Sequence, residues 1–251
     1  MKSVYDEQSE RWIEMKRNGK NINHIYLEKP AMKNKISDLG GKDVLCLGVG
    51  SGEEIELLRE FHPKSIVGTD LSSKLIESAQ LSFPEYEFYA CDMENQPLIN
   101  NSVDFVYSSL VMHYKKSWEA TFKEIYRILR PGGIFLFSTH HPVRWSAYQS
   151  KIKGHNKRIL GYDKLKDKEP IIYGDYLNNT KLTDVWFGDF EVEYYHKPFG
   201  EIIPEIIKSK FVIADFVEPK PTKQFESIDP KAYKVNNKIP LFMIFELIKQ
   251  S

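Results

Sequence analysis

The sequence has few cysteines and no long apolar run. Cys46 and Cys91 are the only cysteines in 251 residues, and both fall in or beside apolar segments typical of strands. Such positions favour buried, unpaired thiols over a disulfide and a reducing compartment over an oxidising one. No run of about 18 apolar residues occurs, and the polar first ten residues lack the apolar core of a signal peptide. We therefore expect a cytoplasmic protein without a membrane partner.

The chain also lacks an excess of charge of either sign. Its 35 basic residues balance its 35 acidic residues, so no global attraction to nucleic acid or to an acidic membrane is expected. Zinc-ligand spacing, a P-loop lysine and a nucleophile elbow are missing as well, and we expect no metal site. With 41% hydrophobic and 28% charged residues, the composition is that of an ordinary globular protein.

What the chain does contain is an apolar stretch followed by alternating glycines. Residues 44–47 have the continuous apolar pattern of a buried parallel strand, and Gly48, Gly50 and Gly52 follow it. Glycines permit a sharp turn and the close approach of a ligand to the backbone. A helical pattern begins at Glu53. A strand, a glycine-rich loop and a helix in this order predict a ligand site at the carboxyl edge of an open α/β sheet.

Strand and helix patterns alternate up to residue 140. A mostly helical cover over residues 1–40 ends at two glycines, and helices are expected to begin at caps formed by Ser72 and Ser117 and, for the latter, to stop at Pro131. Repeated βα units, four in number before a fifth strand, predict a doubly wound, Rossmann-like α/β sheet with a binding core over residues 41–140. The expected strands are residues 43–48, 65–70, 86–92, 102–109 and 134–139.

The regular pattern breaks after residue 140. Residues 141–195 mix aromatic and charged residues without a period, which predicts an inserted lid after the fifth strand. Residues 196–251 predict a helix near 202–207 and two strands at 211–217 and 241–248. Because no helical pattern separates these two strands, we expect a final antiparallel hairpin that completes a seven-stranded sheet. Aromatic side chains of the lid either line an acceptor pocket or form a small core of their own: Trp145, Tyr148, Tyr162, Tyr173, Tyr176 and Trp186.

Acidic residues end two of the predicted strands. Asp70 lies 18 residues after Gly52, and Asp92 ends the third strand. An acid at about this interval accepts hydrogen bonds from the two hydroxyls of a ribose. A dinucleotide loop would carry a glycine at Glu53, and the carboxylates of Glu53 and Glu54 at a helix start would repel a pyrophosphate. We therefore expect an adenosyl ligand without phosphates, such as the cationic S-adenosylmethionine.

Five ordered motifs resemble those of the class I S-adenosylmethionine-dependent methyltransferases, over about residues 40–140: 44–52, 68–72, 91–94, 103–106 and 129–133. The resemblance implies that Gly48, Gly50 and Gly52 pass the methionine part of the cofactor, and that Asp70 with Leu71 holds the ribose. It implies that Asp92 and Met93 read the adenine, that Ser108 lies near the amino acid part, and that S-adenosylhomocysteine is the product. Cys46 departs from the pattern, because the family has an acid there.

Candidate catalytic and covering residues lie near the same edge. His113, His140 and His141 follow strand ends, where each could accept a proton from the acceptor or bond to a loop backbone. His113 could instead contact the cofactor. Tyr5 and Trp12 could close over the cofactor or pack against the edge of the sheet. A base is needed only if the acceptor loses a proton, since positioning can supply much of the catalysis.

We expect a small-molecule acceptor that is methylated on an oxygen or a nitrogen atom. Basic residues between Lys151 and Lys168 favour an RNA acceptor such as tRNA, or they form a solvated loop. A further alternative is a non-catalytic scaffold or sensor that binds S-adenosylmethionine, whereas Glu53 and Glu54 disfavour a nicotinamide dehydrogenase. The residues leave the acceptor and the oligomeric state open.

Overall fold

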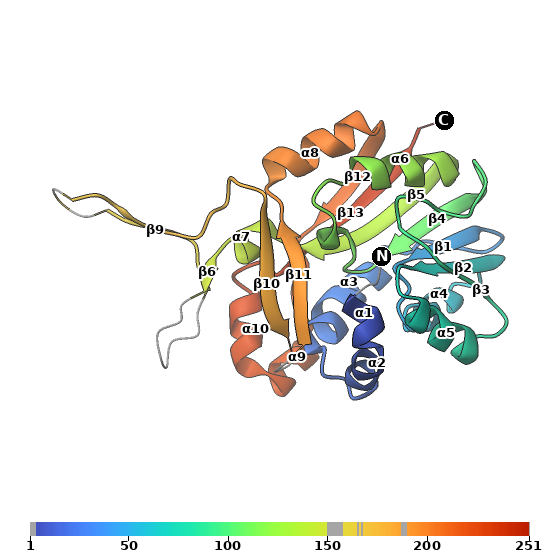
Figure 1. Ribbon diagram of the computed structural model, residues 1–251, viewed down its shortest axis with the longest axis horizontal. Coiled ribbons are helices and arrows are strands. Elements are labelled where there is room, and N and C mark those ends of the chain that lie inside the picture. The colour runs from blue at the N-terminus through green and yellow to red at the C-terminus, as the bar shows by residue number, and fades with distance from the viewer. Residues whose placement is uncertain (1–3, 150–157, 165, 167, 187–189, 251) are drawn as a thin grey trace.

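A seven-stranded sheet forms the centre of the molecule, in the order β12-β13-β5-β4-β1-β2-β3 (Figure 1). The computed structural model describes residues 4–149, 158–164, 166, 168–186 and 190–250. All strands of the sheet run parallel except β13, which is antiparallel to both β5 and β12. The strands are β1 (Asp43–Leu47), β2 (Ser65–Asp70), β3 (Glu87–Ala90), β4 (Val103–Ser108), β5 (Leu129–His140), β12 (Phe211–Val217) and β13 (Phe242–Lys249). The Rossmann-like fold and its reversed final strand are confirmed.

Helices cover both faces of this sheet (Figure 1). α6 (Glu119–Ile128) and α8 (Phe199–Lys208) pack on one face, where Trp118 and Phe122 meet Phe137 of β5 in a buried core. The other face is covered by α3 (Lys29–Lys33), α4 (Ile55–Arg59) and α5 (Ser73–Ser82). Central parallel strands are apolar throughout because both of their faces are buried. The strand order reverses between β1 and β4, where such sheets open a crevice at the carboxyl ends of the strands.

The N-terminal residues are helical, as expected, and pack beside two late helices. They form α1 (Val4–Glu7), α2 (Ser9–Arg17) and a π-helical turn η1 (His24–Glu28) before α3. Leu27 of η1 shares a small buried cluster with Phe225 of α9 (Lys223–Ile228) and with Phe242. α10 (Pro230–Asn236) follows α9. The two ends of the chain thereby build one wall at the edge of the sheet.

The segment after β5 forms a short helix, an arm and a hairpin. Figure 1 shows β6 to β9 in an arm that extends away from the sheet. The hairpin is formed by β10 and β11. Alternate residues of β11, Phe190, Val192 and Tyr194, pack against Tyr5 and Trp12 of the N-terminal helices. The elements are α7 (Pro142–Trp145), β6 (Tyr148–Gln149), β7 (Arg158–Ile159), β8 (Gly161–Asp163), β9 (Ile171–Tyr173), β10 (Thr180–Trp186) and β11 (Phe190–His196). The division of the chain at residues 40, 140 and 195 stays a prediction.

The structure corrects three boundaries that the sequence suggested. α3 ends at Lys33, well before the glycine pair, and Gly40 instead forms a bridge with Pro63. The N-cap of α6 is Trp118, although the Ser117 hydroxyl still accepts a hydrogen bond from the Glu119 N–H at 3.3 Å. Residues 131–133 lie inside β5 rather than ending a helix, because the chain is already extended at residue 129.

Two expectations about connections are also wrong. Residues 91–102 connect β3 to β4 through turns, so helices follow β1, β2 and β4 but not β3 in the described chain. Aspartate, asparagine and proline in this connection favour turns over a helix. α9 and α10 lie between β12 and β13, where no helix was expected. The Asp229 carboxylate caps α10 by accepting the Ala232 N–H at 2.9 Å, with Pro230 in the first turn.

Candidate functional site

A cavity of about 710 Å³ lies at the carboxyl edge of the sheet, beside the crevice between β1 and β4. Its volume falls within the roughly 300–1,000 Å³ of small-molecule sites. Gly52, Ser108 and His141 do not line it. The cavity brings together most of the side chains and glycines that the sequence singled out: Tyr5, Gly48, Gly50, Asp70, Leu71, Asp92, Met93, His113 and His140.

The glycine-rich loop leaves β1 with a backbone that only glycine adopts readily. Gly48 and Gly50 have φ of +71° and +58°, in the left-handed region. A Cβ on Gly48 would lie 2.3 Å from a methyl carbon of Val111, so no larger residue fits there. Gly52 is placed differently, because its missing Cβ makes room for the Phe83 ring at the end of α5. The loop therefore brings bare backbone to the cavity at Gly48 and Gly50.

Asp70 is fixed at the end of β2 by two backbone donors. The Gly50 N–H donates to Oδ2 and the Ser72 N–H donates to Oδ1, each at 2.9 Å. Burial raises the pKa of Asp70, although these two hydrogen bonds favour the charged form. Leu71 beside it is 44% exposed. Asp70 and Leu71 thus both line the cavity, and their role in binding the cofactor stays a prediction.

The second strand-end acid has a cation as partner. The Lys115 ammonium donates to both carboxylate oxygens of Asp92, at 2.7 and 2.8 Å. Burial acts to raise the pKa of Asp92, but the hydrogen bonds from Lys115 and the Glu94 N–H hold it below its usual value. Sequence reasoning missed Lys115, since nothing in the pattern links it to a residue on another strand. Met93 lies beside this pair on the cavity wall.

His113 and His140 are stacked on each other. The ring centroids of His113, in the turn η2 (Met112–Tyr114), and His140 are 3.7 Å apart with the planes 10° from parallel. His140 stacks in turn on Trp145, at 3.8 Å. Neither ring nitrogen of His113 has a hydrogen-bond partner among the described residues. Burial lowers the pKa of His113 to about 3 and moves the pKa of His140 well below its usual value, so both imidazoles are neutral near pH 7.

His141 and Ser108 point elsewhere. The Nδ1 atom of His141 accepts the Val143 N–H at 3.3 Å and caps α7, and its Nε2 atom lies 2.8 Å from the Glu218 carboxylate. Ser108 is fully buried in the sheet. Its neighbour Ser109 lines the cavity instead and donates to the Glu28 carboxylate at 3.0 Å. The serine that lines the cavity is therefore Ser109, which directly follows the predicted Ser108.

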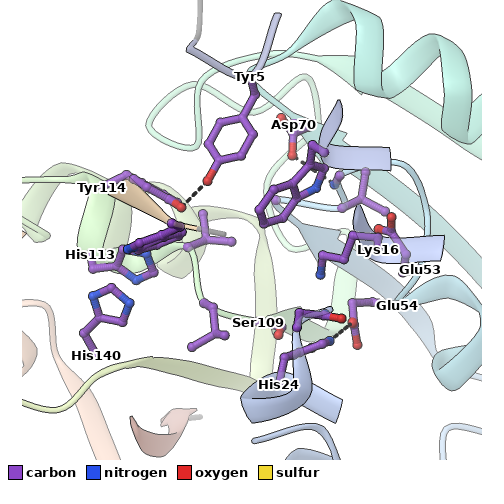
Figure 2. A pocket seen from close by; sticks show the side chains of 18 of the residues that line it. Tyr5, Lys16, His24, Glu53, Glu54, Asp70, Ser109, His113, Tyr114 and His140 are labelled. Atoms are coloured by element: carbon purple, nitrogen blue, oxygen red, sulfur yellow. Dashed lines mark hydrogen bonds and ion pairs between the residues drawn. The ribbon is translucent and has the colours of Figure 1, made fainter. Parts of the chain in front are cut away.

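A buried ionic network lies under the same wall, and sequence reasoning missed it. His24 bridges two carboxylates: its Nδ1 atom lies 2.8 Å from Glu28, and its Nε2 atom lies 3.0 Å from Glu54, a contact drawn in Figure 2. Burial and Lys16 act to lower the pKa of His24, but the two carboxylates outweigh them and raise it. The pKa of Glu54 is strongly lowered, because its cationic partners overcome the cost of burial. The four-residue spacing of His24 and Glu28 on one helical face was the available signal.

Cys46 occupies the position at which the family has an acid. Cys46 is buried in the core under the sheet, where burial raises the pKa of its thiol, and it does not line the cavity. Glu53 and Glu54 do line it, from the loop that follows. In Figure 2, Glu53, Glu54 and Asp70 lie on one side of the cavity, and His113 and His140 lie on the other.

Aromatic rings close the cavity from the N-terminal and hairpin sides. The hydroxyls of Tyr5 and Tyr114 are hydrogen-bonded to each other (Figure 2). The rings of Tyr5 and Trp12 both contact Phe190 of β11, at centroid distances of 5.6 and 5.5 Å. Tyr5 and Trp12 therefore line the cavity and also pack on the hairpin. Of the lid aromatics, Trp145 and Trp186 line the cavity, whereas Tyr148 and Tyr162 are exposed on the arm.

The basic stretch from Lys151 to Lys168 is described only in part. Residues 151–157, 165 and 167 lie outside the described residues. Arg158 lines the cavity and forms an ion pair with Asp184 at 2.7 Å.

Among all the residues that the structure describes, no helix is both long and apolar enough to cross a membrane.

Comparisons with known proteins agree with this geometry. Residues 45–137 match a family model described as a methyltransferase domain. A Haemophilus influenzae protein described as uncharacterized is 27% identical over 229 residues, covering 86% of each chain. The malonyl-[acyl-carrier protein] O-methyltransferase of Marinomonas sp. is 39% identical over 100 residues, which cover only 38% of this chain and 37% of that protein.

Among solved structures, an S-adenosylmethionine-dependent methyltransferase from Mesorhizobium loti shares the fold. The two superpose with a TM-score of 0.70 at 24% identity, over 87% of this chain and 96% of the other. The matched domain contains the glycine-rich loop, Asp70 and Asp92, which lie together at the cavity. The chain therefore contains a methyltransferase domain at residues 45–137 and shares the fold of an S-adenosylmethionine-dependent methyltransferase, which makes it an enzyme with S-adenosylmethionine as its cofactor.

Proposed function

We propose that this enzyme moves the methyl group of S-adenosylmethionine to an oxygen or nitrogen atom of a small molecule bound beside His113 and His140. The observation that carries the proposal is the division of one cavity into two sides. Acids, bare glycine backbone and Lys16 form one side, and neutral imidazoles with aromatic rings form the other (Figure 2). A cationic cofactor and a neutral nucleophile each find a matching environment there.

The residues on the acidic side fit the cofactor. Gly48 and Gly50 let a ligand approach the backbone, and Asp70 can accept hydrogen bonds from ribose hydroxyls. Glu53 adds negative charge, which favours a cation and disfavours a pyrophosphate, whereas the charge of Glu54 is balanced by His24 and Lys29. When bound, S-adenosylmethionine supplies a methyl group activated by the positive sulfur.

The imidazole side would hold the acceptor. A neutral ring nitrogen of His113 can accept a hydrogen bond from an acceptor hydroxyl or amine, which aims the lone pair of that group. The lone pair forms the new bond to the methyl carbon as the carbon–sulfur bond breaks with its electrons going to sulfur. The proton of the acceptor then passes to His113 or to solvent. Tyr5, Trp12 and Phe190 exclude water from the reacting groups.

Two further findings bear on the acceptor. The name of the Marinomonas relative specifies O-methylation of a malonyl group, which favours an oxygen as the acceptor atom. Arg158 belongs to the basic stretch that favoured RNA, yet it lines the cavity and pairs with Asp184 instead of standing on a basic surface. The next experiment separates a small acceptor from the two alternatives, an RNA acceptor and a non-catalytic scaffold.

The experiment offers the protein tritium-labelled S-adenosylmethionine with either a dialysable small-molecule extract or total tRNA. We expect label in dialysable products, and we expect His113→Phe to lose most of this transfer while S-adenosylhomocysteine still binds. His62→Asn, at an exposed histidine outside the cavity, is the control and should keep full activity. Label retained on tRNA, or tight cofactor binding without transfer to either pool, would contradict the proposal.

A further inference from the structure

Basic side chains line more than one wall of the cavity. Lys16, Lys20 and Lys115 line it together with the acids, and Lys115 pairs with Asp92 at 2.7 Å. Two guanidinium groups, Arg144 of α7 and Arg158 of β7, lie on the part of the wall built after β5. Among the described residues no acid lines that part, so an anion would meet guanidinium groups there without a competing carboxylate on the wall.

Arg144 is the less neutralised of the two arginines. It is half-buried, and its guanidinium donates to the Asn236 side-chain oxygen at 3.2 Å. No carboxylate forms an ion pair with it within the described residues. Burial lowers the pKa of Arg144, and the positive charge of Arg158 lowers it further. A half-buried guanidinium without a carboxylate partner is costly unless a ligand completes it.

Arg158 is held by stacking as well as by charge. Its guanidinium lies 4.4 Å from the centroid of Trp145, whose ring also stacks on His140. His113, His140, Trp145 and Arg158 thereby form one continuous stack that runs along the cavity wall. Among the described residues, Arg158 pairs with the carboxylate of Asp184, whose Oδ2 atom also accepts a hydrogen bond from the Tyr194 hydroxyl at 3.2 Å. Within this part of the chain, Asp184 is thus the one acid paired with the two guanidinium groups.

We propose that the acceptor carries an anionic group, a carboxylate or a phosphate, which Arg144 and Arg158 hold at this end of the cavity. The proposal rests on the proposed function, since it assigns a chemical class to that acceptor. Arginine binds planar oxyanions through two parallel hydrogen bonds, which fixes orientation as well as position. The apolar body of the acceptor would lie against Trp186, Leu241 and Phe242, which line the space beside the arginines.

This arrangement sets the direction in which the acceptor lies. The stack places the neutral imidazoles of His140 and His113 next in line after Arg158 and Trp145. An acceptor anchored through its anion at the arginines would extend its nucleophile toward His113, on the side that faces Asp70 (Figure 2). Arg144 and Arg158 would therefore determine specificity without touching the reacting atoms.

The test is calorimetric titration of the protein saturated with S-adenosylhomocysteine, so that no transfer occurs. The anionic probes are benzoate, hexanoate and phenyl phosphate. Benzamide is the uncharged comparison for benzoate and phenyl phosphate, and hexanamide is the uncharged comparison for hexanoate. We expect at least one anion to bind about tenfold or more tightly than its amide, the gain from charge-assisted hydrogen bonds in a partly buried site. Preference for benzoate or hexanoate would identify a carboxylate, and preference for phenyl phosphate would identify a phosphate.

Variants separate this inference from the proposed function. Arg144→Gln and Arg158→Gln should abolish the preference for the anion and keep the affinity for S-adenosylhomocysteine. Arg59→Gln is the matched control, because Arg59 is exposed on α4 and pairs with Glu56 outside the cavity. Equal binding of anions and amides, or a preference that survives both substitutions, would overturn the inference alone. Failure of the wild type to bind S-adenosylhomocysteine would instead contradict the proposed function.

Discussion

Single carboxylates decide how the cavity is charged. Asp70 joins the glycine-rich loop to the start of α5, because its two oxygens accept N–H groups from Gly50 and Ser72. Glu54 is paired with His24 inside the wall, so its charge is compensated where it is buried. On the acidic side of the cavity, Asp70 therefore remains available to a ligand, whereas Glu54 stabilises the fold.

Asp70→Asn tests the first of these roles. The amide keeps one oxygen acceptor but loses the negative charge, so we expect affinity for S-adenosylhomocysteine to fall by about tenfold or more. Isothermal calorimetry measures the change, and thermal unfolding checks that the fold is retained. Asp163→Asn is the control, because Asp163 is exposed on the arm and bonds only to Tyr173 among the described residues. Unchanged affinity in Asp70→Asn would remove the ribose role from this residue.

Glu54→Gln tests the second role. Removing one partner of a buried ion pair costs about 3 kcal/mol or more, so the free energy of unfolding should fall by that order. Glu56→Gln at an exposed pair with Arg59 should change it by about 1 kcal/mol or less. Urea unfolding near neutral pH measures both variants. Similar small losses in both would mean that the His24–Glu54 contact does not stabilise the fold.

At the scale of elements, the sequence predicted the sheet far better than the walls of the cavity. The apolar residues of β1 and β4 are buried, which is why their runs predicted strands, whereas β12 is an edge strand with only Phe211 buried; the Ser72 hydroxyl caps α5 as expected. α9 and α10 were missed, although the Asp229 cap was visible in the chain. No local pattern could bring Trp145 onto His140, because that contact depends on how the segment after β5 folds back.

The hairpin of β10 and β11 gives a prediction at this scale. Phe190 is 1% exposed and contacts both Tyr5 and Trp12, so Phe190→Ala opens a gap between the hairpin and the N-terminal helices. We expect S-adenosylhomocysteine to dissociate several-fold faster in stopped-flow measurements. Glu191→Ala, at the exposed neighbour on β11, should leave the rate unchanged. Equal rates in both variants would show that the hairpin does not cover the cofactor.

At the scale of the whole molecule, the buried histidines make stability depend on pH. The pKa of His113 lies at about 3 in the folded chain against 6.5 for the free group, so the unfolded chain binds the additional proton. Stability from His113 is therefore complete above pH 6.5 and is lost as the pH falls toward 3. His24 acts in the opposite direction, because its raised pKa adds stability below pH 6.5 that is lost at higher pH.

His113→Phe measures the first contribution. From pH 7 to pH 5 the wild type should lose about 2 kcal/mol of unfolding free energy through His113, and the variant should lack this loss. Urea unfolding at the two pH values provides the comparison, with His62→Asn as the control for an exposed histidine. An equal loss in the wild type and in His113→Phe would mean that His113 is not buried in its neutral form.

The central claim is that the acidic side of this cavity binds a cationic adenosyl cofactor. Parallel calorimetric titrations with S-adenosylmethionine, S-adenosylhomocysteine and NADH test it most directly. We predict micromolar binding of the two adenosyl-sulfur compounds and no binding of NADH, because Glu53 and Glu54 lie where a pyrophosphate would have to bind. Binding of NADH, or binding of none of the three, would contradict the account.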